Sequence, residues 1–280
     1  MRLTLACAQF APLKAEVSQN LDRIADLARQ AHGEGARLVV TPETSTSGYF
    51  LEGGVAESAM SSQQLLDEMC ARLESLDLDL VVGFYESANG TLHNSAAYLS
   101  IPERRVVHVY RKFFLPTYGV FDEERFATRG RELGVFDSRF GRIGLLICED
   151  VWHSIMPALA ALKGAQMILV PSASPARGFA GDGIENHNRY RRMLRALCEE
   201  HGVYCANCQL TGFEGGKGFI GGSMILDPFG RIVAEGPVGE DHLLLAEIDL
   251  DLIGIARVQS PLLPDLHSAW SDLTRIAGEI

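Results

Sequence analysis

Long hydrophobic runs are missing from this sequence. No stretch approaches the roughly 18–20 consecutive apolar residues that a helix needs to cross a bilayer. The N-terminus, MRLTLACAQFAP, carries one basic residue and an apolar run that is too short and too interrupted for a signal peptide. We therefore interpret this segment as the first strand of a cytoplasmic protein that has no membrane as a partner.

Positive charge is also scarce. The 280 residues include 25 Lys and Arg against 36 Asp and Glu, which gives a formal net charge of -11. Nucleic acids and anionic membranes bind to clusters of lysine and arginine, so the charge balance argues against either as a partner. Hydrophobic residues make up 47%, an ordinary share for a soluble globular enzyme. Because no linker, repeat or low-complexity tract divides the chain, we expect a single domain over residues 1–280.

Cysteine is too sparse for a disulfide framework in a chain of this length. The one cluster is CEEHGVYCANC, where Cys205 and Cys208 are spaced as CxxC and Cys198 and His201 lie upstream. VYCANCQL reads as a strand, in which positions three apart face opposite sides of a sheet. There is also no second CxxC. We therefore expect buried packing for this pair, and no metal or cofactor for the protein.

Short apolar strands alternate with helices along the whole chain. Strands joined partly by hairpins and partly by helical crossovers predict an α/β protein with mixed sheets, and helices covering the sheet faces. The helices are expected over residues 18–32, 56–76 and 184–201, with a further one that begins after Ser154 and ends before Gly164. The strands are expected over 2–10, 37–41, 79–84, 94–100, 105–112, 133–136, 142–147, 166–172, 203–210, 220–227 and 243–249.

Three polar residues each end an apolar strand. Glu43 follows RLVVTP, Lys112 follows VVHVYR, and Cys148 follows IGLLI. In open α/β sheets, reactive groups gather just beyond the carboxyl ends of strands. If the three ends meet, Glu43 could act as general base and acid for a cysteine nucleophile.

The cysteine stands in an unusual local context, RIGLLICEDVWH. Apolar burial and the neighbouring acids Glu149 and Asp150 both disfavour a thiolate. A lysine ammonium within roughly 4–6 Å would favour the thiolate and offset these acids, and the helix that follows would add a weak positive dipole. Each signal alone also fits an ordinary role: a structural cysteine, a solvated lysine, and a turn at TPE. Periodicity does not decide whether the three residues meet.

Several motifs in the same order resemble the nitrilase, or carbon–nitrogen hydrolase, superfamily. They are AQFAP at 8–12, TPETSTSGY at 41–49, NSAAYL at 94–99, YRKFFLPTYGVFDEERF at 110–126, ICEDVW at 147–152 and GGSMILDPFGRIVAEG at 221–236. The resemblance implies a four-layer α-β-β-α sandwich with mixed sheets. It also implies assembly into homo-oligomers, as dimers or larger.

The same resemblance implies roles for individual residues. Cys148 would attack a C–N carbon, Glu43 would be the base, and Lys112 would stabilise the oxyanion together with the backbone N–H of Glu149. Glu123, in the FDE segment, would be a second glutamate that holds the site. A surface charge in the acidic run DEE is the alternative reading of Glu123.

Three further residues are candidates for binding the substrate. Tyr118 lies in the loop after Lys112 and either walls the pocket or packs the loop down. Trp152 stands with His153 where omega-amidase relatives carry an arginine that binds a substrate carboxylate, so that anchor is missing here. Arg177 lies in PSASPARGFAGDG, at 171–183, and either meets an anionic group of the substrate or is solvated.

Within the superfamily, K-x-x-LPTYGVFDE and CEDVW are most similar to the glutaminase domain of glutamine-dependent NAD synthetases. Those enzymes carry an ATP-dependent domain with a phosphate loop, and no Walker-type motif is present here. We therefore do not expect this chain to make NAD alone.

The leading hypothesis is an amidase that releases ammonia from a small primary amide through a cysteine thioester. One alternative is a glutaminase-like subunit that passes ammonia to a separate synthetase partner. Others are a nitrilase or N-carbamoyl hydrolase, and a catalytically inactive scaffold.

Overall fold

The computed structural model describes residues 1–74, 76–180 and 183–280 of the chain. Its strands are β1 (Arg2–Gln9), β2 (Leu38–Val40), β3 (Asp79–Ala88), β4 (Thr91–Ser100), β5 (Arg105–Arg111), β6 (Gly134–Ser138), β7 (Gly141–Leu145), β8 (Met167–Ser172), β9 (Phe179–Ala180), β10 (Gly183–Ile184), β11 (Tyr204–Gln209), β12 (Thr211–Glu214), β13 (Lys217–Ile220), β14 (Met224–Leu226), β15 (Ile232–Glu235) and β16 (His242–Asp249). Its α-helices are α1 (Val17–Gly33), α2 (Val55–Ser58), α3 (Ser62–Leu73), α4 (Ile155–Leu162), α5 (Glu185–His201), α6 (Leu252–Gln259) and α7 (Leu262–Ala277).

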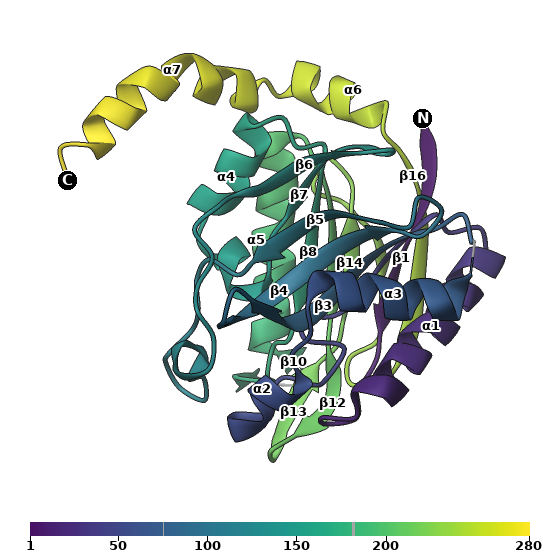
Figure 1. Cartoon of the computed structure of the whole chain (residues 1–280). Helices are drawn as coiled ribbons and strands as arrows, with labels where there is room; N and C mark the ends of the chain where they lie inside the picture. The colour runs from purple at the N-terminus through teal and green to yellow at the C-terminus, as the bar shows by residue number, and fades with distance from the viewer. Residues whose placement is uncertain (75, 181–182) are drawn as a thin grey trace.

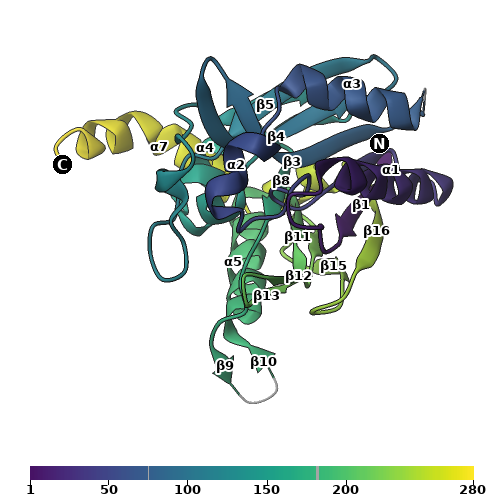
Figure 2. The same ribbon diagram turned by 60° about the horizontal axis from the view of Figure 1, so that its bottom comes forward.

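Two mixed sheets form the centre of the molecule. In the described residues each has six strands, in the orders β16-β1-β2-β3-β4-β5 and β15-β14-β11-β8-β7-β6. Helices α1 and α3 cover one outer face, and α4 and α5 cover the other (Figures 1 and 2). The predicted α/β class and four-layer α-β-β-α sandwich are therefore confirmed.

The apolar runs of the inner strands follow from burial on both faces. Along β1, Leu3, Leu5 and Cys7 belong to the core between the two sheets. The alternate residues Ala6 and Ala8 belong to the core beneath α1 and α3. A strand with both faces covered has no solvent side, so its sequence shows no alternation of apolar and polar residues.

Because several strands run in the same direction, their carboxyl ends lie at one edge of the two sheets. In the first sheet β1, β2 and β3 run parallel, and β5 returns to the same direction after two antiparallel pairings. In the second sheet β7, β8 and β11 run parallel. The segments after β2, β5, β7 and β8 are the ones that carry the candidate site residues.

Two predicted elements are wrong in detail. The helix expected over 56–76 is divided into α2 and α3, because Ala59 and Met60 are extended and Ser61 begins α3 with a capping box to Gln64. The strand expected over 220–227 is divided into β13 and β14. Gly221 and Gly222 separate them with φ angles of +62° and +64°, in the left-handed region that glycine adopts readily.

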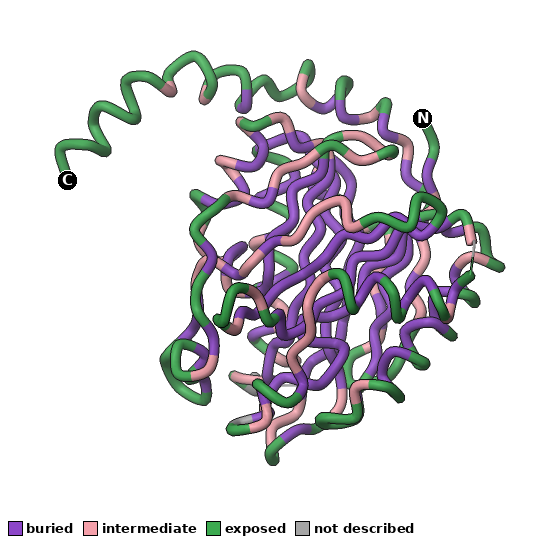
Figure 3. The backbone as a smooth tube through the Cα atoms, viewed as in Figure 1, coloured by how far each residue is buried: buried purple, intermediate pink, exposed green. Residues whose placement is uncertain are grey.

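The C-terminal helices α6 and α7 and the short strand β15 had no counterpart in the sequence analysis. Helix α7 leaves the body of the molecule, and most of its residues are exposed (Figures 1 and 3). Its exposed side chains include Leu262, Leu273 and Ile276. None of the described helices is both long enough and apolar enough to cross a membrane.

The CxxC cysteines are buried, as predicted. Cys205 lies beside Cys198 of α5, whereas Cys208 lies beside Cys7 of β1, so the two side chains face different neighbours. Among residues 1–74, 76–180 and 183–280, no group of three or more His, Cys, Asp or Glu side chains is placed to hold a metal ion.

Candidate active site

Glu43, Lys112 and Cys148 come from different strand ends and meet between the two sheets. Lys112 Nζ lies 2.7 Å from Glu43 Oε1. Ala173, just after β8, connects this pair with the cysteine: its N–H donates to Glu43 Oε2 over 2.8 Å, and its carbonyl oxygen lies 3.9 Å from Cys148 Sγ. The structure thus brings together the three side chains that the sequence analysis singled out.

The loop after β2 is held against β3, and this fixes the position of Glu43. A Cβ atom on Gly83 of β3 would lie 2.2 Å from the carbonyl oxygen of Pro42, so only glycine allows this approach. Ser45 Oγ donates to the Gly83 carbonyl over 3.0 Å, and Thr41 Oγ1 lies 2.7 Å from Ser45 Oγ. The polar run TSTS is therefore buried because it holds the loop that carries the glutamate.

Lys112 sits between two carboxylates. Besides Glu43, it donates to Glu123 Oε1 over 2.6 Å. Asn94 of β4 donates to both acids, at 2.8 Å to Glu43 Oε1 and 3.2 Å to Glu123 Oε2. The hydroxyl of Tyr49 also donates to Glu123. Because Glu123 is only 6% exposed, its reading as a surface charge is wrong.

Glu214 holds the segment that carries Tyr49. Its Oε2 accepts the backbone N–H groups of Tyr49 over 2.7 Å and Phe50 over 2.8 Å. Gly48, at φ +86°, leaves room for this carboxylate, since a Cβ there would lie 2.9 Å from Glu214 Oε1. Glu214, at the end of β12, thereby fixes a residue that contacts Glu123.

Cys148 begins a 3₁₀ turn that runs to Trp152, and its φ of +45° is unusual for a residue with a side chain. Such strain is characteristic of functional sites. The sulfur lies 3.5 Å from the Tyr190 hydroxyl and 3.8 Å from Ser174 Oγ. Ser154, the plausible N-cap of α4, makes no capping hydrogen bond, because its backbone is already helical at φ -50° and ψ -24°.

The two acids after the cysteine, Glu149 and Asp150, have different hydrogen-bond partners. Neither carboxylate contacts the sulfur of Cys148. Asp150 accepts from the backbone N–H groups of Ile147, Phe113 and Phe114, and from the Tyr110 hydroxyl at 2.8 Å. Glu149 accepts from the Tyr118 hydroxyl at 2.9 and 3.1 Å. Asp150 therefore ties the turn that begins at Cys148 to the segment after Lys112.

The surroundings of Cys148 favour the neutral thiol over the thiolate. Burial and the charge of Glu43 raise the pKa of Cys148 to about 12, although Lys112 lowers it. Burial also raises the pKa of Glu43 to about 7, against the opposing effect of Lys112. Lys112 acts on the thiol in the expected direction, but burial and the charge of Glu43 outweigh it.

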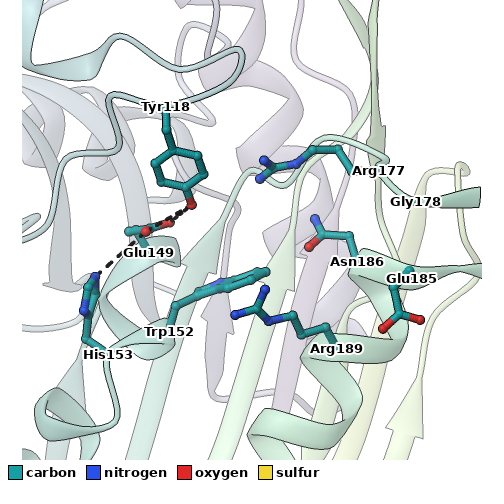
Figure 4. Close-up of a pocket in the computed structure, with 9 residues that line it drawn as sticks. All are labelled: Tyr118, Glu149, Trp152, His153, Arg177, Gly178, Glu185, Asn186 and Arg189. Carbon is teal, nitrogen blue, oxygen red and sulfur yellow. Dashed lines mark hydrogen bonds and ion pairs between the residues drawn. The ribbon is translucent and has the colours of Figure 1, made fainter.

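An open pocket of about 550 Å³ adjoins this buried cluster. It contains all of the predicted substrate-binding residues, and Figure 4 shows Arg189 beside Trp152 and Arg177 across from Tyr118. Its lining residues are Tyr118, Glu149, Trp152, His153, Arg177, Gly178, Glu185, Asn186 and Arg189. Tyr118 thus walls the pocket, and Arg177 reaches it; residues 181–182 of the predicted entrance loop lie outside the described residues.

The sequence analysis missed Asn94, Tyr49, Tyr190 and Arg189. Asn94 carried a usable signal, since it is a polar residue in the otherwise apolar run NSAAYL. Tyr190 and Arg189 lie in a helix rich in arginine, where nothing in the local pattern separates a pocket residue from a solvated one. Which residues of α5 are buried and which face solvent is seen only in the folded chain.

The chain belongs to the carbon-nitrogen hydrolase family, whose model matches residues 4–258. The predicted superfamily resemblance is therefore confirmed. A glutamine-dependent NAD(+) synthetase of Thermotoga maritima is 28% identical over 89% of this chain and 42% of that protein. The chain thus spans less than half the length of the synthetases it matches.

Two other relatives match this chain over nearly their whole length. An N-carbamoylputrescine amidase of Solanum tuberosum is 28% identical over 95% of this chain and 93% of that protein. The crystal structure of an amidase from Nesterenkonia sp. superposes with a TM-score of 0.73, at 28% identity, over 96% of both chains. That amidase is described as a member of the nitrilase superfamily.

Proposed function

We propose that this protein is an amidase that hydrolyses a small primary amide and releases ammonia through a thioester on Cys148. One observation carries the proposal: the buried thiol of Cys148 and the Glu43–Lys112 ion pair meet at the backbone of Ala173, and burial raises the pKa of Glu43 to about 7. A base that titrates near neutral pH is suited to take a proton and return it. The arrangement is that of an activated nucleophile, with Lys112 and Glu123 holding the base in place.

In the first half of the reaction, Cys148 Sγ attacks the amide carbon as its proton passes to Glu43. The carbonyl oxygen becomes an oxyanion that faces Lys112 Nζ and the backbone N–H of Glu149. A donor in this position contributes about 3–4 kcal/mol to lowering the barrier. Glu43 then returns the proton to the leaving nitrogen, the C–N bond breaks, and ammonia departs.

In the second half, Glu43 takes a proton from a water molecule, which attacks the thioester carbon. The C–S bond breaks, the thiol regains its proton from Glu43, and the carboxylic acid product leaves. The amidase from Nesterenkonia sp. supports Cys148 as the nucleophile, because a variant of that amidase carries the acetamide moiety of fluoroacetamide on its active-site cysteine. Other variants of that amidase were solved with acrylamide and butyramide.

The direct test is ammonia release by the isolated protein from a panel of small amides, nitriles and ureido acids. We expect amides to be hydrolysed, and Cys148→Ala to abolish this while the far-UV circular dichroism and melting temperature stay unchanged. Cys70→Ala is the matched control, since Cys70 lies on α3 beneath the far face of the first sheet. Equal turnover by Cys148→Ala would overturn the mechanism.

A second candidate function is a glutaminase-like subunit that supplies ammonia to a separate synthetase. The similarity to NAD(+) synthetases over 42% of their length favours it. Turnover of glutamine only when a synthetase is added would support this candidate over a free-standing amidase.

The similarity to an N-carbamoylputrescine amidase makes ureido compounds the third arm of the panel. Turnover of ureido acids or nitriles without amides would replace the amidase proposal. No turnover of any compound, with Cys148 unreactive to iodoacetamide, would favour an inactive scaffold.

Three broader expectations stay predictions: a single domain over 1–280, a cytoplasmic location, and assembly into a homodimer or larger oligomer. The exposed apolar side chains of α7 favour the last of these. Sedimentation equilibrium measures the oligomeric state, and a purely monomeric protein would contradict it.

A further inference from the structure

We propose that the amide substrate carries a carboxylate at the end remote from its amide group, and that Arg189, assisted by Arg177, binds this carboxylate. The inference rests on the proposed amidase function and names the substrate class for the same site. The sequence analysis found no carboxylate anchor after the nucleophile, where Trp152 and His153 stand. The structure supplies arginines to the same pocket from other elements.

The pocket lies directly beside the nucleophile. Glu149 and Trp152, which line it, belong to the 3₁₀ turn that begins at Cys148. Arg189 precedes Tyr190 on α5, and the Tyr190 hydroxyl lies 3.5 Å from Cys148 Sγ. The rings of Trp152 and Tyr190 pack edge to face, with centroids 5.2 Å apart. A substrate attached at the sulfur would therefore extend into this pocket.

Both arginines are stacked on aromatic rings. Arg189 Cζ lies 4.3 Å from the centroid of the Trp152 ring. Arg177 Cζ lies 5.0 Å from the Phe121 centroid and 5.7 Å from the Tyr118 centroid. Figure 4 shows the two guanidinium groups on the same side of the pocket, on either side of Asn186. Stacking fixes a guanidinium plane while its N–H edge stays available for a carboxylate.

Neighbouring arginines of α5 are engaged elsewhere, which distinguishes Arg189 from them. Arg192 pairs with Glu185 over 2.6 Å, Arg191 with Glu235 over 3.4 Å, and Arg195 donates to the Gly230 carbonyl. Within residues 1–74, 76–180 and 183–280, neither Arg177 nor Arg189 forms an ion pair. Arg177 and Arg189 are therefore the cationic side chains of the pocket that are available to bind a ligand.

The acidic side chains of the pocket already have partners. Both carboxylate oxygens of Glu149 accept from the Tyr118 hydroxyl, and His153 Nε2 lies 3.9 Å from Glu149 Oε1. Glu185 is the partner of Arg192. The positive charge of the stacked arginines is thus less compensated than the negative charge opposite. This local positive charge favours an anionic over a cationic substrate end, although the chain as a whole has a net charge of -11.

The test compares three amides of equal length that differ at the far end: pentanamide, its analogue with a terminal carboxylate (glutaramate), and 5-aminopentanamide. We expect the wild-type protein to hydrolyse glutaramate with a kcat/KM at least about tenfold above the other two, the scale of one charged hydrogen-bonded pair. Arg189→Met should lower kcat/KM for glutaramate by about ten- to a hundredfold, mainly through KM, and abolish the preference.

Arg191→Met is the matched control, because Arg191 leaves the same helix and neither it nor its partner Glu235 lines the pocket. It should keep the preference for glutaramate. Since Arg189 and Arg191 are both exposed, neither substitution should change the fold. Faster hydrolysis of pentanamide or 5-aminopentanamide than of glutaramate would overturn the inference while the amidase function stands.

If none of the three amides is hydrolysed, the amidase proposal fails, and titration with glutarate tests the anchor separately. Calorimetry should then detect glutarate binding that is lost in Arg189→Met and kept in Arg191→Met. The absence of glutarate binding to the wild-type protein, or equal binding by Arg189→Met, would overturn the inference.

Discussion

Two adjoining regions of this molecule differ in the surroundings of their charged side chains: one region buries them, and the other leaves them open to solvent. In the buried cluster, Lys112 is 1% exposed and lies between Glu43 and Glu123, with Asn94 bound to both acids. In the pocket beside it, Tyr118 is 47% exposed and the arginines stack on aromatic rings. The first region is closed to water, and the second is open to it.

The contrast separates what the two regions can do. Buried charges interact strongly and depend on one another, so a change in the cluster alters stability and reactivity together. Charges in the open pocket are screened by solvent, and their loss should alter the choice of substrate with little effect on folding. Under the proposed function, we therefore expect changes in the cluster to alter the rate of reaction and changes in the pocket to alter the choice of substrate.

The largest effect is expected from Lys112→Met. It leaves Glu43 and Glu123 buried without their shared cation, so we expect a loss of about 3–5 kcal/mol in the free energy of unfolding, measured by urea denaturation. Activity should be lost, and alkylation of Cys148 by iodoacetamide at neutral pH should slow, because Lys112 lowers the pKa of that thiol.

Arg192→Met, which breaks an exposed ion pair with Glu185, is the control and should change stability by less than about 1 kcal/mol. If Lys112→Met unfolded at the same urea concentration as the wild type, the buried network would not stabilise the fold. An unchanged alkylation rate would contradict the electrostatic link between Lys112 and Cys148.

The next effect concerns pH. Because burial raises the pKa of Glu43 to about 7, the base form disappears as the pH falls through that value. We expect kcat/KM to fall about tenfold per pH unit below the midpoint. Glu43→Gln should reduce kcat by about a hundred- to ten-thousandfold and remove this fall of kcat/KM at low pH.

If kcat/KM of Glu43→Gln still fell at low pH with the same midpoint, the titrating group would be a residue other than Glu43. Asp150 is the alternative on this side of the range, since burial raises its pKa to about 6. Comparing the pH profiles of the wild type and Glu43→Gln distinguishes the two acids.

The smallest effect of the three is expected at Glu214, which touches neither Lys112 nor Cys148. Glu214→Ala leaves the buried N–H groups of Tyr49 and Phe50 without an acceptor, so we expect a loss of about 1–3 kcal/mol in unfolding free energy. Displacement of Tyr49 from Glu123 should also lower kcat by about tenfold or more.

Glu214→Gln keeps a carbonyl oxygen for the two N–H groups and should restore both stability and kcat. Rescue of stability without rescue of kcat would contradict a positioning role that acts through hydrogen bonding alone. Urea denaturation and steady-state kinetics on the same preparations give both quantities.

The sequence was most informative where a residue depends on its own strand. Apolar runs that end in Glu43, Lys112 and Cys148 predicted both the strands and the polar residues at their ends, and the structure places these ends together. It was least informative for helices that lie on the surface, such as α7, and for the division of 56–76 into two helices. There the local pattern is compatible with more than one boundary, and packing against β3 decides between them.

The sequence by itself determined the fold class, the family and the identity of the three central residues, because strand patterns and motif order are local properties of the chain. Only the tertiary structure decided the protonation of Cys148, the sharing of Lys112 by two acids, and the presence of Arg189 in the pocket. These depend on burial and on distances between residues far apart in the chain, such as Glu43 and Ala173, 130 positions apart. A charge acquires its effect from the solvent it loses and the partners it gains, and both are set only when the sheets pack.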